Sequence, residues 1–146
     1  MSINEYELLN ALENNTNSSI INLNSSKIKT IKNNILQKLQ LDRDVLKKFH
    51  KKLKDYRYVD GMHDIEYGYY IRWISLKNPE KELKLTNGGW VNDMLIEKTG
   101  IQILLRNNQN RFFKIKLDEC VVFQKLSDEE KVILSVLDLL KSENKL

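Results

Sequence analysis

The chain has 146 residues with 41% apolar and 30% charged residues, and its formal net charge is +4. This length suits one domain with extensions, and no apolar run is long enough for a membrane helix. The single cysteine, Cys120, excludes an internal disulfide framework. Because the N-terminus also lacks the pattern of a secretory signal, we expect a protein of a reducing intracellular compartment.

The first part of the chain, residues 1–57, is predicted to be a helical region. Apolar residues recur at weak helical spacing over 3–13, which is enough for two or three turns. The next segment, 14–26, is rich in Asn and Ser and has no usable apolar period, so we expect a loosely packed linker there.

Two amphipathic helices are predicted after this linker. Apolar residues recur every three or four positions over 26–40, and Ser25 or Ser26 can cap that helix. A second apolar stripe runs over 42–56, where Asp42 is suited to the N-cap position. Lysines flank the second stripe on both sides, which indicates a helix with one apolar face and one basic face.

From residue 58 onward the apolar spacing changes to the alternation that is typical of strands. Asn87-Gly88-Gly89 is a strong signal for a tight hairpin turn, since such turns need positive φ angles. The predicted strands cover residues 68–76, 83–86, 90–97, 101–106, 111–117 and 120–124.

A last helix is predicted after the strands. Ser127 and Glu130 have the spacing of a capping box at its start. The fold class is therefore α+β, with the chain divided into a helical region, 1–57, and a small antiparallel β-barrel with a C-terminal helix, 58–146. A closed barrel leaves no free strand edges, and an SH3-like or Tudor-like barrel is favoured over an OB-like one.

A single barrel interior is expected to hold the core. Strand alternation assigns six side chains to this interior, and truncating one of its large aromatic members to Ala should cost about 3–5 kcal/mol. The six are Ile71, Trp73, Ile103, Phe113, Ile115 and Phe123.

Four stretches of the barrel segment carry a family resemblance. They are KKLKDYRYVD at 51–60, GYYIRWISL at 68–76, LTNGGWV at 85–91 and NRFFKIKLDECVVFQKLSDEEKVIL at 110–134. The run over 51–140 resembles small uncharacterised proteins of giant nucleocytoplasmic large DNA viruses. This resemblance implies a viral origin, with the host cytoplasm or the virion as location, and it transfers no functional residue.

Catalytic and metal chemistry find little support in the sequence. His50, His63 and Cys120 lack the close paired spacing of zinc ligands, and no phosphate-binding glycine motif surrounds Gly88. Acidic neighbours should raise the pKa of the Cys120 thiol, which disfavours a nucleophile. Four carboxylates are interpreted as solvated loop acids: Asp60, Asp64, Glu66 and Asp93. We therefore expect no enzyme activity, no cofactor, no metal and no small-molecule substrate.

The basic excess is concentrated in one stretch. Residues 27–57 contain eleven basic and three acidic side chains, enough to supply the sequence-independent part of nucleic-acid affinity. A second basic group on the strands interleaves with Tyr70 and Phe112. For the basic helices, the alternative is an amphipathic helix whose lysines are only solvated. For the strand face, the alternative is that the N-terminal or C-terminal helices cover it. The candidate nucleic-acid contacts are Lys47, Lys48, Lys51, Lys52, Lys54, Arg57, Arg72, Lys114 and Lys116.

Two functions remain open at this point. The first is a non-catalytic structural or adaptor protein, which acts through a protein partner or through self-association. The second is a nucleic-acid-associated protein that binds phosphates through the basic helices. The exposure of the lysines in 27–57 distinguishes them, because phosphate binding needs these side chains on one accessible surface.

Overall fold

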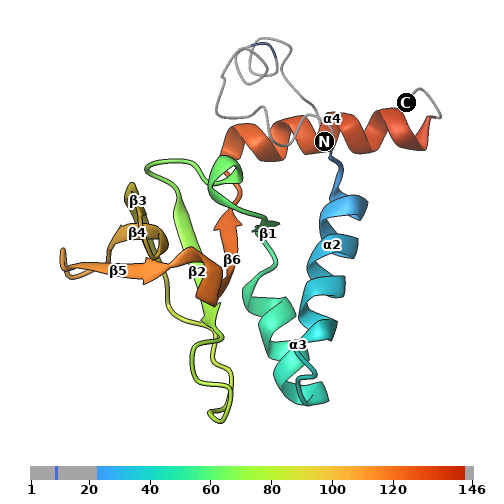
Figure 1. Ribbon diagram of the computed structural model, residues 1–146. Coiled ribbons are helices and arrows are strands. Elements are labelled where there is room, and N and C mark those ends of the chain that lie inside the picture. Colours follow the sequence, from blue (N-terminus) through green and yellow to red (C-terminus); the bar gives the residue numbers. More distant parts are fainter. Residues whose placement is uncertain (1–8, 10–22, 144–146) are drawn as a thin grey trace. The chain divides into compact units, whose positions relative to one another are not determined.

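A computed structural model describes residue 9 and residues 23–143 (Figure 1). The helix expected over 3–13 and most of the expected linker, 14–26, lie outside these residues. The helices are α2 (Ser25–Lys38), α3 (Arg43–Lys52) and α4 (Asp128–Ser142), with single 3₁₀ turns η2 (Met62–Asp64) and η3 (Leu117–Glu119). The strands are β1 (Tyr56–Val59), β2 (Tyr70–Ser75), β3 (Gly89–Glu97), β4 (Gly100–Arg106), β5 (Phe112–Lys116) and β6 (Cys120–Lys125).

The chain divides into two compact units. Among the described residues, one unit combines those up to residue 34 with those from residue 126 onward, and the other is 35–125. This division differs from the expected boundary after residue 57. The physical reason is packing, because α3 and the last turn of α2 share an apolar cluster with the strands, whereas α4 shares one with the first turns of α2.

The larger unit contains one antiparallel sheet with the strand order β1-β6-β2-β3-β4-β5. The α+β class is thereby confirmed. Strand β1 was not expected, since the predicted helix extends to residue 56 and the first predicted strand begins at residue 68. The strand expected over 83–86 is reduced to one bridge between Ile74 and Leu85. Consequently β3 pairs with β2, and Asn87-Gly88-Gly89 does not close a tight hairpin.

The sheet bends back on itself without closing. Between Val91 and Asp93 the register of β3 on β4 shifts, which marks a bulge of the kind that bends a strand. In Figure 1 the direction of β5 crosses that of β2 and β6. Within the described part of the chain, β1 and β5 are the two edges of the sheet, so the expected barrel closure is not found.

The inner face of the bent sheet holds one core. Ile71, Trp73 and Ile103 are buried there, as expected. Phe113 and Ile115 of β5 are half-buried and pack against this core. The placement of Phe123 was wrong, because alternation along β6 directs Val122 inward and Phe123 to the opposite face.

The outer face of the sheet carries a second core, beneath α3. Phe49 and Leu53 pack with Tyr56, Ile74 and Phe123, and all five are buried. This arrangement uses the apolar stripe that the sequence predicts for this helix. Asp42 occupies the N-cap position of α3, although its side chain accepts no capping hydrogen bond.

The smaller unit joins α4 to the start of α2. The capping box is confirmed, since Ser127 Oγ accepts from Glu130 N at 3.1 Å and Glu130 Oε1 accepts from Ser127 N at 2.9 Å. The side chain that caps α2 is that of Asn24, whose Oδ1 accepts from the Lys27 backbone N–H at 2.8 Å. Ser25 instead donates from its hydroxyl to the Asp138 carboxylate at 2.6 Å, which links the two helices.

Candidate nucleic-acid interface

The exposed side of α3 and its flanks forms the main basic surface of the larger unit. Between residues 38 and 54 the chain has seven Lys or Arg side chains against two Asp, and all seven are exposed. Phe49 and Leu53 of the apolar stripe are buried against the sheet, so the lysines on the other side of the helix remain in solvent. We call this set the basic helix surface: Lys38, Arg43, Lys47, Lys48, Lys51, Lys52 and Lys54.

Arg57 does not belong to this surface, although the sequence placed it among the phosphate contacts. It lies on β1, and only 2% of the residue is exposed. Its guanidinium donates to Asp64 Oδ1 at 2.9 Å and to the Asp64 backbone oxygen at 3.1 Å. The reason is strand alternation, which turns Arg57 inward beside Gln124 of β6. A phosphate in solvent cannot reach this group.

Buried and half-buried polar side chains lie close to Arg57, and no pattern in the sequence predicted them. Gln124 is fully buried, and its Oε1 accepts from the backbone N–H of Glu66 at 2.9 Å. Burial raises the pKa of the Glu66 carboxyl, while nearby Arg57 lowers it and Asp64 raises it. The Asp64 carboxylate is therefore a partner of a buried cation, and not a solvated loop acid as expected.

The aromatic and basic residues of β2 and those of β5 take part in different contacts. Arg72 is half-buried, and its Nε donates to the Thr86 backbone oxygen at 2.8 Å. Tyr70 donates its hydroxyl to the Asn87 backbone oxygen at 2.6 Å. Arg72 thus belongs to the contacts that hold the β2–β3 connection, whereas Lys114 and Lys116 line a pocket elsewhere on the sheet.

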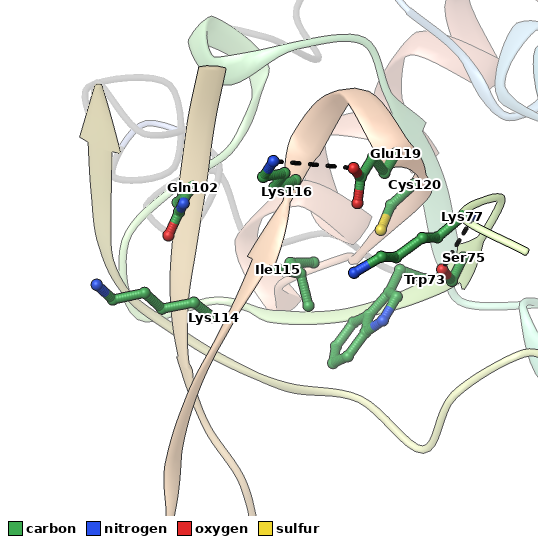
Figure 2. Close-up of a pocket in the computed structure, with 9 residues that line it drawn as sticks. All are labelled: Trp73, Ser75, Lys77, Gln102, Lys114, Ile115, Lys116, Glu119 and Cys120. Atoms are coloured by element: carbon green, nitrogen blue, oxygen red, sulfur yellow. Dashed lines mark hydrogen bonds and ion pairs between the residues drawn. The ribbon is translucent and has the colours of Figure 1, made fainter. Parts of the chain in front are cut away.

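This pocket, which we call the lysine pocket, has a volume of about 310 Å³. It opens where β5 passes the end of β2, with the Trp73 indole, Ile115 and the Cys120 thiol as apolar lining (Figure 2). Its charged and polar lining comprises Lys77, Lys114, Lys116, Glu119, Ser75 and Gln102.

The lysine pocket has an excess of positive charge. Figure 2 shows the Lys77 side chain extending from the end of β2 toward Ile115, while the Lys114 side chain points away from Trp73. Lys116 lies 3.9 Å from the Glu119 carboxylate, and both side chains are partly exposed. A pair of this length and exposure contributes little energy, so Lys116 remains able to bind an anion.

A second pocket shares Trp73 with the first, and we call it the amide pocket. Its volume is about 320 Å³. The rings of Tyr70, Trp73 and Phe113 line it together with Asn and Gln residues of two connections, and none of the described residues that line it is charged. The amide side chains are those of Asn87, Asn107, Asn108 and Gln109.

The turn beside the amide pocket explains how its side chains are held. Asn107 Oδ1 accepts from the backbone N–H groups of Gln109 and Arg111 at 2.9 and 3.0 Å, as in an Asx turn. Asn110 adopts φ 58° in the same turn. The closeness of this turn to Trp73 depends on the bend of the sheet.

Nucleophilic and metal chemistry gain no support from the geometry. Burial, together with the nearby charges of Glu119 and Asp118, raises the pKa of Cys120 to about 11. The thiol is therefore protonated at neutral pH, which agrees with the prediction. In the portion that the structure describes, no three His, Cys, Asp or Glu side chains gather as metal ligands.

Comparison of the chain with protein-family models, curated proteins and solved structures finds no match. None of the helices in the described residues has the length and apolar character needed to cross a membrane.

Proposed function

We propose that the protein binds nucleic acid through its phosphates, with the basic helix surface as the contact. The observation that carries this proposal is the exposure of every Lys and Arg side chain between residues 38 and 54. Exposure distinguishes a helix whose charged groups can reach phosphates from a helix whose charged groups are buried within the protein.

Charge and rigidity support the proposal together. Phosphate contacts from lysines supply affinity that does not depend on sequence, since each contact releases condensed counterions. The lysines project from a helix whose opposite side is fixed on the sheet through Phe49 and Leu53. A fixed array of cations loses less conformational freedom on binding than the same charges on a free segment.

Salt dependence is the test. For five phosphate contacts, affinity for duplex DNA should fall about 10²- to 10³-fold between roughly 50 and 200 mM salt. Changing Lys47, Lys51 and Lys54 to Glu should weaken binding to all sequences alike and flatten the salt slope by roughly one unit per lost contact. Fluorescence anisotropy with a labelled duplex at several salt concentrations measures both quantities.

A matched control separates local contacts from net charge. Lys81, Lys84 and Lys98 are exposed and lie outside the basic helix surface, so their triple change to Glu alters the net charge equally. This control should keep most of the parent's affinity. Equal losses in the two triple variants, or a parent that does not bind duplex at low salt, would exclude the proposed function.

A second candidate is the structural or adaptor role, and one observation favours it. Phe112 on the edge strand β5 is 58% exposed. An exposed edge strand can pair with a strand of another chain. If this role holds, Phe112→Ser should abolish self-association or partner capture, measured by sedimentation and by pull-down, while DNA binding stays weak in both forms.

The finer fold assignment and the source of the chain are part of the same proposal. The β2–β5 meander, the 3₁₀ turn η3 and the return of β6 beside β2 support an SH3-like or Tudor-like barrel that is open between its edge strands, β5 and β1. This strand order disfavours the OB-like alternative. The resemblance of residues 51–140 to giant-virus proteins supports a role in the virion or in the host cytoplasm.

A further inference from the structure

The lysine pocket and the amide pocket share one lining residue, Trp73, and we refer to these two neighbouring pockets together as the groove. Each pocket is at the lower end of the volumes that bind small molecules, about 300–1,000 Å³. Their chemistry differs. One end offers rings and uncharged amides, and the other offers lysines around an apolar floor.

The amide pocket suits a nucleobase. A base presents a flat π-face that stacks on an aromatic ring, and a rim of donors and acceptors that amide side chains can satisfy. Phe113 supplies a half-buried ring, and Asn108 and Gln109 supply exposed amides. None of the described lining residues is acidic, so a cationic side chain of a protein partner would find no opposite charge there. An aliphatic side chain would leave the amide groups without hydrogen-bond partners.

The lysine pocket suits a phosphate of the same strand. Along β5, Phe113 and Lys116 are three residues apart, about 10 Å at the rise of a β-strand, and because this odd spacing turns their side chains to opposite faces, the path between them passes around the free edge of β5. A nucleic-acid strand advances by roughly 3.4 Å per nucleotide when stacked and by more when unstacked. A run of two or three nucleotides can therefore reach from a base at Phe113 to phosphates at Lys77 and Lys116.

The groove selects against duplex. Trp73, which the two pockets share, is only 7% exposed, so the rings of the groove are recessed. A base that remains paired and stacked in a duplex cannot enter such a site. An unpaired base can enter it without the free-energy cost of unpairing and unstacking.

We propose that this groove binds single-stranded nucleic acid, with one unstacked base in the amide pocket and the neighbouring phosphates in the lysine pocket. The inference rests on the proposed function and extends it, because it assigns the single-stranded form to a surface distinct from the basic helix surface. Duplex contacts remain on α3.

The test compares a labelled single-stranded oligonucleotide of mixed sequence with its duplex by anisotropy. Phe113→Leu keeps an apolar side chain in the core but removes the stacking ring, and it should weaken single-strand binding about 5- to 100-fold. Asn108→Asp and Lys77→Glu change exposed groups and should act in the same direction. Duplex binding should stay within about twofold of the parent.

Controls keep the outcomes separate. Lys98→Glu changes the charge as Lys77→Glu does but lines neither pocket, and it should be neutral. In a Trp90→Phe background, single-stranded oligonucleotide should quench the fluorescence of Trp73, and duplex should not. Circular dichroism confirms that each variant is folded.

Two results would overturn the inference in distinguishable ways. If the folded groove variants bind single strand like the parent while the Lys47, Lys51 and Lys54 variant loses duplex binding, the groove assignment alone is wrong. If the parent binds neither form at low salt, the proposed function fails and the groove assignment fails with it.

Discussion

The indole of Trp73 on β2 lies 5.6 Å from the ring of Phe113 on β5, measured between centroids, although β3 and β4 separate these strands in the sheet. The contact is possible because the sheet bends back over its own inner face. This ring contact positions β5 across β2, and the lysine pocket and the amide pocket both lie beside the contact. Stability and the candidate groove therefore depend on the same ring.

Trp73→Ala should destabilise the larger unit by about 3–5 kcal/mol, since it removes a buried indole from the centre of the inner core. Phe113→Leu should cost clearly less, because Phe113 is half-buried and Leu retains much of its apolar contact. Urea unfolding followed by circular dichroism measures both values. A cost below 1 kcal/mol for Trp73→Ala would contradict the bent-sheet core.

Arg57→Ala should destabilise the protein by about 3–5 kcal/mol, because it leaves Asp64 without its partner at a mostly buried site. Lys54→Ala, three residues away and exposed, should stay within about 0.5 kcal/mol of the parent. Urea unfolding at neutral pH compares the two variants. If they lose equal stability, the inward orientation of Arg57 is wrong.

Sequence reasoning identified the elements whose signals are local. The apolar stripe of α3 and the Ser127–Glu130 capping box depend on residues a few positions apart, and the structure confirms both. Strand β1 was missed because its first residue, Tyr56, continues the apolar stripe of α3, and only pairing with β6 makes residues 56–59 a strand. Such pairing involves residues far apart in the sequence.

The residues of the candidate sites also differ in whether a local sequence pattern could predict their placement. Exposed lysines of an amphipathic helix are predictable, because the apolar stripe alone decides which side is solvated. The inward turn of Arg57 and the joining of Lys116 and Trp73 in one pocket depend on the arrangement of strands that are far apart in the sequence. Phe123 was assigned to the wrong core because a short apolar run does not reveal which face each residue takes.

The Cys120 thiol should react slowly in the folded protein. Burial and nearby Glu119 and Asp118 raise its pKa to about 11 from an ordinary value of 9.0, so its thiolate fraction is about 100-fold below that of an ordinary thiol. Alkylation by iodoacetamide at pH 8 should show a correspondingly low rate. In denaturant the rate should return to that of a free cysteine, and a fast reaction of the folded form would contradict the assignment.

The same shift predicts a loss of stability at high pH. Above pH 9 the unfolded chain releases the Cys120 proton while the folded chain retains it, so the free energy of unfolding falls from about pH 9 to about pH 11. Burial raises the pKa of Tyr56 and Tyr58 as well, which continues the decline at higher pH. Cys120→Ala should flatten the part between pH 9 and 10, as measured by urea unfolding across this range.

Gly88→Ala should be more destabilising than the same change at Gly68, although both glycines have positive φ angles, +102° and +80°. At Gly88 a Cβ would lie 2.5 Å from the Ile71 backbone oxygen, whereas at Gly68 it would meet no atom within 4 Å. Gly68→Ala should therefore cost roughly the 1–3 kcal/mol of backbone strain alone. Gly88→Ala should exceed that cost, because relieving the clash moves the β2–β3 connection away from β2. Urea unfolding of the two variants decides the matter, and equal losses would show that the chain does not pass this close to β2 at Gly88.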